Sequence, residues 1–205
     1  MGLFKTKHHS AADGFLHRKL GPTLGSITLF TLEVLQIVII SAAIIFPIRY
    51  FLIKPFYVKG ASMEPNFYDH EYLVIDELTY RFREPMRGEI VVFRYPNDRS
   101  QFFIKRVVAL PGETVEITDG NVVIYNDAHP NGIIAEENYL VETTEGKQKT
   151  TLSPGEFFVL GDNRNESLDS RFFGPVMKNE IIGRVWVRGL PISRATTFDL
   201  PEYNF

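Results

Sequence analysis

The sequence predicts a mainly β body behind one N-terminal transmembrane helix. Three observations lead to this fold class. An apolar stretch long enough to cross a bilayer lies near the N-terminus, short runs with strand character follow it, and no long helical periodicity occurs after residue 55. A chain of 205 residues suits one domain with an appended segment.

The membrane-like stretch runs from Ile27 to Ile48, and only Glu33 interrupts it. Its length matches the roughly 20 residues that cross a bilayer core. Aromatic and basic residues follow Pro47 and suit an interfacial anchor that extends to residue 53. Basic residues are balanced on the two sides of the span, so charge does not decide its orientation.

Two alternatives to a retained membrane anchor are a cleaved secretory signal and the core helix of a soluble fold. Ser41 and Ala43 offer the small-x-small pattern of a cleavage site. The apolar run continues well past them, whereas a cleaved signal has a short apolar core. The retained anchor is therefore the preferred interpretation.

The remainder of the chain carries short apolar runs separated by turn signals. A hairpin is predicted over 114–126, where Asp119-Gly120 suits the two-residue turn between alternating strands. Further strands are predicted by five runs rich in β-branched and aromatic residues: EYLVIDEL (71–78), EIVVFRY (89–95), FFIKRVVAL (102–110), EFFVLG (156–161) and GRVWVRG (183–189).

A polar excursion from the sheet is predicted over 126–155, with one short strand at ENYLVET, 137–143. Short helical turns are expected around 166–172 and 178–181. The C-terminal tail, ATTFDLPEYNF, has no clear periodicity and is expected to be partly loose.

Composition removes several kinds of site. The net charge is -3 with both signs interspersed, and no basic patch carries interleaved aromatics, so nucleic acid is not expected as a partner. The chain has no cysteine and therefore no disulfides, thiolate ligands or cysteine nucleophiles. Its five histidines show no metal-ligand spacing, so we expect neither a metal nor another cofactor. The oligomeric state is not indicated.

Ser62, within VKGASMEPNF, follows the apolar stretch and is the candidate nucleophile. A serine hydroxyl needs a base within hydrogen-bond reach. His70 lies in a polar, turn-like stretch, and nothing marks it as that base. A lysine can serve if burial lowers its pKa from about 10.4 by about two to three units.

Lys105 is the lysine that best meets this requirement, because it lies inside the apolar run FFIKRVV. Strand alternation puts Phe103, Lys105 and Val107 on one face and Arg106 on the other. The lysine thus has apolar neighbours on its own side, as a lowered pKa requires. The alternative is an edge-strand lysine that prevents aggregation, and the residues alone leave both interpretations open.

The stretch GDNRNESLDSR, 161–171, concentrates charged and amide side chains directly after an apolar strand. One interpretation is a loop that caps and salt-bridges itself, since Asp and Asn bond their own backbone in turns and Arg can pair with carboxylates. The other is a rigid support that orients catalytic groups.

Together, four segments resemble the type I signal peptidases, membrane-bound serine proteases that remove signal peptides from exported proteins. The segments occur in the family's order behind an N-terminal span, and Gly60 matches the Gram-positive-like branch. They are GASMEPNF (60–67), RGEIVVFRYP (87–96), FFIKRVVALPGE (102–113) and GDNRNESLDSRFFGPV (161–176).

The resemblance implies a β-rich catalytic body of the signal-peptidase type and a Ser–Lys dyad, with Ser62 as nucleophile and Lys105 as general base. Where some members have a serine that helps to stabilise the oxyanion, Gly60 has no side chain. The Ser62 backbone N–H is therefore expected as one donor, and the second is unassigned. The supporting residues implied are Ser167, which helps to orient the lysine, the ion pair Asp169–Arg171, and Asp162 and Arg164 with structural roles.

The implied substrates are preproteins that carry a signal peptide and are cut after small residues of the Ala-x-Ala type. An extended substrate would pair with the strand that holds Phe103 and Ile104. Shallow pockets for its small side chains are expected to be lined by Val58, Met63, Phe103 and Ile104, while Gly60 permits close approach of the substrate backbone.

The implied organisation is a single-pass protein of the cytoplasmic membrane, with the lipid bilayer as a further partner. Residues 1–26 form a cytoplasmic segment, 27–53 the transmembrane helix and interfacial anchor, and 54–205 the extracytoplasmic catalytic domain. The two alternative functions are a self-cleaving Ser–Lys autopeptidase and a non-catalytic, membrane-tethered binding module.

Overall fold

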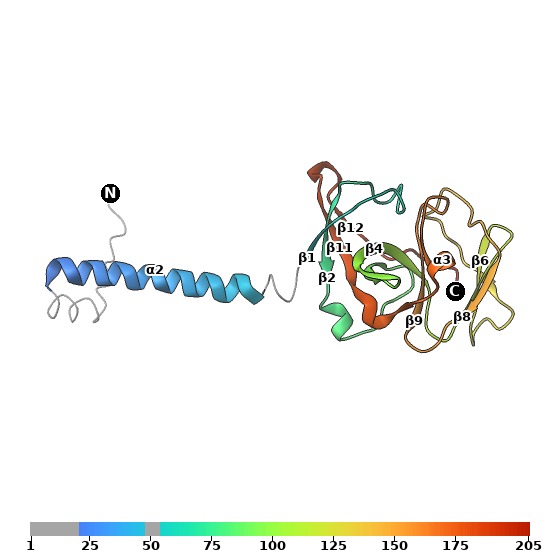
Figure 1. Ribbon diagram of the computed structural model, residues 1–205, viewed down its shortest axis with the longest axis horizontal. Helices are drawn as coiled ribbons and strands as arrows, with labels where there is room; N and C mark the ends of the chain where they lie inside the picture. Colours follow the sequence, from blue (N-terminus) through green and yellow to red (C-terminus); the bar gives the residue numbers. More distant parts are fainter. Residues whose placement is uncertain (1–20, 48–53) are drawn as a thin grey trace, which may run out of the picture. The chain divides into compact units, whose positions relative to one another are not determined.

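The computed structural model describes residues 21–47 and 54–205, and the chain divides into two compact units, residues 1–50 and 51–205 (Figure 1). The first unit contains helix α2, Pro22–Pro47. It ends at the proline, where the loss of a backbone donor favours a helix end. The predicted interfacial anchor at 48–53 lies outside the described residues.

Helix α2 has the properties of a membrane span. The stretch Ser26–Phe46 has a mean hydropathy of 2.4, and none of it is buried against protein. Its large apolar side chains are exposed, as is Glu33. The core helix of a soluble fold would be mostly buried, so this observation disfavours that alternative.

The larger sheet of the second unit has eight antiparallel strands. Seven follow the path β1–β2–β11–β3–β4–β9–β10, and β12 pairs with β11. The strands are β1 Lys54–Tyr57, β2 Tyr72–Asp76, β3 Ile90–Tyr95, β4 Asp98–Ala109, β9 Glu156–Leu160, β10 Val176–Met177, β11 Ile181–Leu190 and β12 Thr196–Thr197.

The smaller sheet has four antiparallel strands in the order β7–β6–β5–β8. Asp119 and Gly120 both have positive φ, 50° and 81°, and form the predicted turn between β5 and β6. The strands are β5 Thr114–Thr118, β6 Asn121–Tyr125, β7 Ile133–Ile134 and β8 Gln148–Thr151. The short helices of the unit are α3 Ser170–Phe173, η2 Thr79–Arg81, η3 Lys178–Glu180 and η4 Ile192–Arg194.

Strand alternation divides the buried apolar residues into three clusters. Val92 packs with the turn after β1, whereas its neighbour Val91 packs with β9 on the opposite face. A third cluster joins the two sheets, with Phe158 from β9 and Ile117 from β5 among its members. These clusters fix β4 and the turn after β1, the two elements that hold the candidate dyad.

Two expectations for the body were wrong. The segment 137–143 is not a strand, because its polar residues contact buried arginines from other parts of the unit; the excursion instead contributes β7 and β8. The tail is packed rather than loose: Tyr203 and Phe205 lie against the cluster between the sheets, and the Phe205 ring lies 4.9 Å from the Arg87 guanidinium carbon. The cationic and apolar contacts together hold it.

Candidate active site

Ser62 lies in a tight turn between β1 and β2. Gly60 opens the turn with φ of 89°, a backbone conformation that favours glycine. The Phe67 N–H donates to the Met63 carbonyl at 2.8 Å, and both side chains are buried in the core. Anchored in this way, the turn presents Ser62 to β4.

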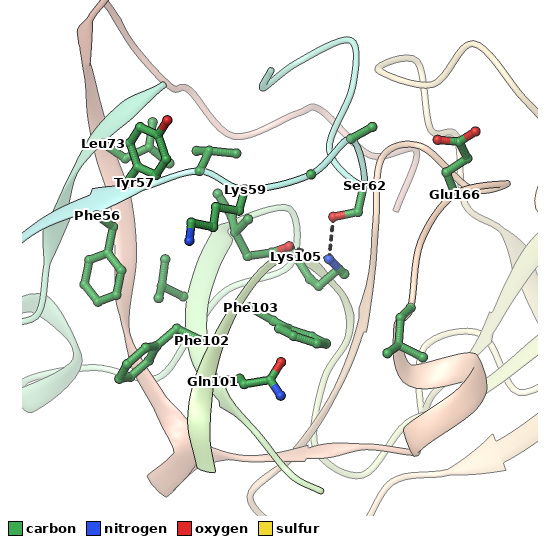
Figure 2. Close-up of a pocket in the computed structure, with 16 residues that line it drawn as sticks. Phe56, Tyr57, Lys59, Ser62, Leu73, Gln101, Phe102, Phe103, Lys105 and Glu166 are labelled. Carbon is green, nitrogen blue, oxygen red and sulfur yellow. Dashed lines mark hydrogen bonds between the residues drawn. The ribbon is translucent and has the colours of Figure 1, made fainter. Parts of the chain in front are cut away.

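Lys105 extends from β4 to the serine. Its Nζ and Ser62 Oγ are hydrogen-bonded at 2.7 Å, and Nζ also donates to the Ile104 carbonyl at 2.8 Å (Figure 2). The Phe103 ring centroid is 5.4 Å from Nζ. The lysine is only 3% exposed, on a strand that pairs with both β3 and β9. It is therefore not the exposed edge-strand lysine of the alternative interpretation.

Burial lowers the pKa of Lys105 from 10.5 to about 8. The charges of Asp169 and Asp162 act in the opposite direction, but desolvation is the larger effect. A substantial fraction of the amine is consequently neutral near pH 8 and can accept a proton from the serine hydroxyl. This is the pKa shift expected from the apolar run.

A cavity of about 670 Å³ opens beside the dyad. Four of the five residues predicted to contact the substrate line it: Val58, Gly60, Phe103 and Ile104. Met63 is not among the lining residues, because its side chain is buried in the core beneath the turn. The other residues that line the cavity are Phe56, Tyr57, Lys59, Ala61, Ser62, Leu73, Val92, Gln101, Phe102, Lys105, Glu166 and Leu168.

The predicted ion pair between Asp169 and Arg171 is present, with 2.8 Å between Arg171 Nε and Asp169 Oδ1. Asp169 also caps α3 and accepts a hydrogen bond from the Gly161 N–H at 3.1 Å. Asp169 thus caps its own loop and also holds Gly161, the residue that follows β9. The interpretation of the loop as a support that orients catalytic groups stays a prediction.

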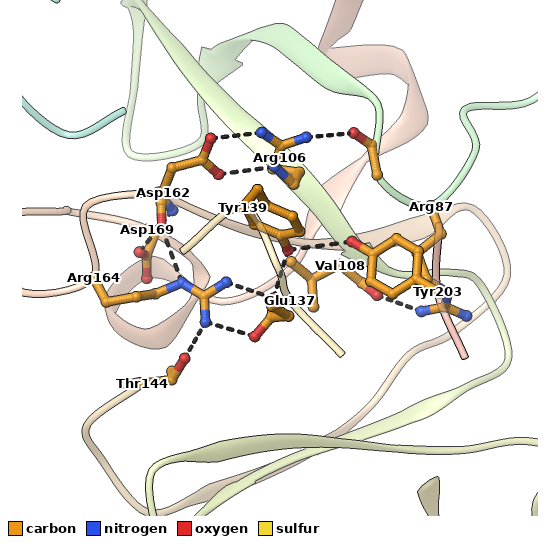
Figure 3. A network of polar contacts seen from close by, with 12 residues as sticks. Arg87, Arg106, Val108, Glu137, Tyr139, Thr144, Asp162, Arg164, Asp169 and Tyr203 are labelled. Atoms are coloured by element: carbon orange, nitrogen blue, oxygen red, sulfur yellow. Dashed lines mark hydrogen bonds and ion pairs between the residues drawn. The ribbon is translucent and has the colours of Figure 1, made fainter. Parts of the chain in front are cut away.

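Asp162 and Arg164 belong to a buried polar network (Figure 3). Asp162 accepts two hydrogen bonds from Arg106, at 2.8 and 2.6 Å, and one from Asn66 at 2.9 Å. Arg164 donates to both carboxylate oxygens of Glu137, at 2.9 and 2.5 Å. These pairs join the loop to β4 and to the polar excursion.

Ser167 lies close to Ser62, on the same side of Gly161, and makes no hydrogen bond to the lysine. Its Oγ is buried and has no hydrogen-bond partner among the described residues. The Ser62 N–H likewise has no partner within residues 54–205, whereas the Gly60 N–H is bonded to Asp69 at 3.1 Å. Ser62 N–H is thus free to serve as an oxyanion donor, and the orienting role of Ser167 stays a prediction.

Sequence reasoning did not single out Gly161 and Asn163, although both lie in the loop it examined. A Cβ on Gly161 would lie 2.5 Å from the Ser62 carbonyl oxygen and against Ser167 Oγ, so only glycine fits. The Asn163 N–H donates to the Ser62 carbonyl at 3.1 Å, and its amide donates to Ala61 at 3.2 Å. A Gly-x-Asn directly after a buried strand was the available signal.

No metal site was found in the part of the chain that is described: no three or more His, Asp or Glu side chains in residues 21–47 and 54–205 could together hold an ion.

Comparison with known proteins assigns the family. Residues 31–189 match the family model "Signal peptidase, peptidase S26". The chain belongs to the signal peptidase I family. It is a serine peptidase that removes signal peptides from preproteins, and its single apolar N-terminal helix is consistent with a membrane anchor.

Individual relatives align over most of their length. A probable signal peptidase I-1 of Synechocystis is 35% identical over 173 residues, covering 80% of this chain and 85% of that one. Signal peptidase I of Leptolyngbya laminosa is 37% identical over 172 residues, covering 80% and 81%. The Gram-positive relatives include signal peptidase IB of Staphylococcus aureus, 29% identical over 192 residues and covering 85% and 94%.

Proposed function

We propose that this signal peptidase cleaves preproteins with Ser62 as nucleophile and Lys105 as general base. The observation that carries the proposal is the 2.7 Å hydrogen bond between Ser62 Oγ and the amine of a buried lysine whose pKa is about 8. A serine needs an adjacent base to become a useful nucleophile, and a desolvated lysine can be that base near neutral pH.

The reaction then follows from this geometry. Neutral Lys105 takes the hydroxyl proton while Ser62 Oγ bonds to the scissile carbonyl carbon, and the Ser62 N–H stabilises the resulting oxyanion. The lysine ammonium gives its proton to the departing amine as the carbon–nitrogen bond breaks. Lys105 next takes a proton from water, whose oxygen attacks the acyl ester, and returns it to Ser62.

The substrate is proposed to lie extended in the cavity and to be cut after small residues of the Ala-x-Ala type. Phe102 to Lys105 pair with β3, whereas the pairing with β9 begins only at Arg106. This leaves an open strand edge beside the dyad, suited to strand addition. Val58 and Ile104 form apolar walls that suit small side chains before the cut.

We further propose the membrane arrangement of the chain: residues 1–26 cytoplasmic, 27–53 as anchor in the lipid bilayer, and 54–205 on the extracytoplasmic side of the cytoplasmic membrane. Support comes from the exposed apolar helix and from the export of the substrates. Since the chain has no cysteine, Ser10→Cys and Asp127→Cys can be labelled in intact cells with an impermeant maleimide. Labelling of Asp127→Cys alone is expected, and labelling of Ser10→Cys alone would reverse the orientation.

The dyad is tested with the full chain in detergent and a peptide that contains Ala-x-Ala. Ser62→Ala and Lys105→Ala should each reduce kcat/KM by at least about 10²- to 10⁴-fold, while the matched surface variants Ser100→Ala and Lys147→Ala should retain activity. In the wild type, kcat/KM should fall as the pH drops below about 8, because Lys105 is then protonated. Cleavage that survives Lys105→Ala would reject it as the base.

A further inference from the structure

The two ends of the cavity differ in chemistry. In Figure 2, Phe56 and Phe102 lie on one side of Ser62, and Glu166 lies on the other. The end near Phe56 and Phe102 is also lined by Leu73, so it is largely apolar. A substrate whose scissile bond is at Ser62 must place one part of its chain at each end.

Glu166 and Leu168 form the second end. They flank Ser167, whose side chain is buried, whereas both Glu166 and Leu168 are exposed. Both line the cavity, and Leu168 is 46% exposed. Within residues 54–205, the Glu166 carboxylate has no hydrogen bond or ion pair. An unpaired carboxylate next to an exposed apolar side chain suits a ligand with an aliphatic stem and a cationic end.

We infer that Glu166 and Leu168 bind the start of the mature protein and favour a lysine or arginine among its first two residues. This inference rests on the proposed function, in which Val58 and Ile104 accept the residues before the cut, so that Glu166 and Leu168 are left for the residues after it. The methylene stem of the basic residue would pack on Leu168, and its charged end would face Glu166. An acidic residue at the same position would be repelled by that carboxylate.

Lys59 gives the opposite end a charge of the other sign. It is exposed, lines the cavity and lies on the Phe56 side of Ser62 in Figure 2. A basic residue before the cut therefore gains nothing from the groove, and the preference for a basic residue is confined to the mature side. Because the two ends of the cavity carry opposite charges, the effect of a charged substrate residue on cleavage shows at which end that residue lies.

The experiment uses detergent-solubilised full chain and Ala-x-Ala peptides with Lys, Ala or Glu at either the first or the second position after the cut. Since an exposed ion pair contributes modestly, the wild type should cleave a Lys peptide about threefold to tenfold more efficiently than its Glu counterpart, as the ratio of kcat/KM values. The ratio should approach 1 for Glu166→Gln, and also in about 1 M salt, where charges are screened. Glu166→Lys should reverse it.

Both peptides are compared on the same variant, so the ratio of their kcat/KM values is unaffected by any general effect of the substitution on Lys105 or on folding. Glu142→Lys makes the same charge change at an exposed residue that does not line the cavity, and it should keep the wild-type ratio. Diaminopropionic acid in place of Lys tests the stem: its short side chain should lose most of the preference, and Leu168→Ser should reduce it about twofold.

The results separate the two proposals. If the neutral Ala peptide is cleaved but Lys and Glu peptides are cleaved equally well, or the ratio survives Glu166→Lys, this inference is wrong while the dyad stands. A further peptide set carries Lys, Ala or Glu at the x position of Ala-x-Ala, before the cut. A preference for Lys over Glu that appears only in this set would also overturn the inference, by reversing the substrate direction. If the folded wild type fails to cleave even the neutral peptide, the proposed function fails and the inference fails with it.

Discussion

Lys105 and Arg106 are neighbours on β4, yet the fold treats their charges in opposite ways. The lysine faces Phe103 and Ser62, and no carboxylate of the described residues forms an ion pair with it. The arginine on the other face forms two hydrogen bonds with Asp162. Both side chains are almost completely buried.

The difference follows from the two chemistries. A guanidinium stays charged in a protein, so burying Arg106 requires a partner, which Asp162 supplies. A lysine loses its charge when it is desolvated without a partner, and the proposed mechanism needs that loss. Strand alternation thus separates a permanent cation from one that must become neutral.

The arginines also protect the lysine from nearby carboxylates. Asp169 and Asp162 both act to raise the pKa of Lys105. Each is paired with an arginine, Asp169 with Arg171 and Asp162 with Arg106, so their charges are largely neutralised locally. These two ion pairs therefore help to keep the amine of Lys105 neutral.

The largest effect on stability is expected from breaking the pair behind the site. Asp162→Ala leaves Arg106 buried without its partner, which should lower the free energy of unfolding by about 3–5 kcal/mol. Denaturant unfolding of the full chain, followed by the fluorescence of the single tryptophan, Trp186, would measure it. Asp199→Ala, at an exposed position outside the network, is the control.

A paired replacement sharpens this prediction. Arg106→Met combined with Asp162→Leu removes both charges, and it should destabilise less than Asp162→Ala alone. If the double variant were the less stable of the two, the explanation from an unpaired buried charge would be wrong.

For Lys105, removing the buried charge is expected to stabilise the folded state, whereas removing the partner of Arg106 destabilises it. Below about pH 8 the folded state holds a buried ammonium, and between about 8 and 10.5 the unfolded state binds more protons than the folded one, so stability rises with pH. This change amounts to about 3 kcal/mol. Lys105→Met removes it, so its stability relative to wild type should be greatest at pH 7 and decline as the pH rises.

The measurement is a pair of denaturant titrations at pH 7 and pH 9.5, with Lys147→Met as the control for replacing an exposed lysine. Loss of the hydrogen bonds to Ser62 and Ile104 affects Lys105→Met at both pH values. The change of the difference with pH therefore isolates the buried charge. A difference that is the same at both pH values would contradict a lowered pKa.

The surroundings of Lys105 could be predicted from the sequence better than the ion-pair partners of the buried arginines. Local alternation and desolvation ranked Lys105 first among the lysines, because its apolar neighbours are adjacent in the chain. The partners of the arginines are remote: Asp162 is 56 residues from Arg106, and Arg164 is 27 from Glu137. No local pattern encodes those pairings.

The two errors have related causes. The segment 137–143 has strand-like side chains, but Tyr139 packs its ring 4.0 Å from the Arg106 guanidinium carbon and Glu137 binds Arg164. Tertiary contacts outweighed its propensity for strand. The tail was expected to be loose because its sequence has no periodicity, and its packing against Arg87 and the cluster between the sheets comes from residues remote in the chain.

Gly161 lies against the Ser62 backbone and the Ser167 side chain. Adding one methyl group there should therefore lower both stability and activity. Gly161→Ala would place its Cβ 2.5 Å from the Ser62 carbonyl oxygen and against Ser167 Oγ, so the backbone must shift. Overpacking of this kind lowers stability by about 1–3 kcal/mol. Displacement of the nucleophile should lower kcat by about 10²-fold while KM changes little.

The control is Gly189→Ala, because the nearest atom to its Cβ would be the Tyr72 carbonyl oxygen at 3.9 Å, an ordinary contact. It should have near wild-type kcat and stability. Equal kinetic effects of the two substitutions would show that the close approach at Gly161 is unimportant for the position of Ser62.

The smallest effect on activity is expected for Arg171. Its replacement tests most directly whether the arginines help to keep Lys105 neutral. Arg171→Gln leaves Asp169 without its cation, so the carboxylate should act more strongly on Lys105 and raise the pKa of the amine. Activity at pH 7 should fall about two- to tenfold, and the whole acid limb of the pH–kcat/KM profile should move to higher pH. Activity on the alkaline plateau should be nearly unchanged.

Arg171→Lys keeps a positive charge near Asp169 and should restore the profile in part, although lysine lacks the forked geometry of arginine. A loss of activity that is equal at every pH, in Arg171→Gln and Arg171→Lys alike, would mean that Arg171 only stiffens the loop. A shifted limb that the lysine partly restores would mean that neutralising Asp169 sets the pH at which Lys105 becomes a base. In that case the ion pairs are part of the catalytic design, because the neutral lysine depends on the paired carboxylates around it.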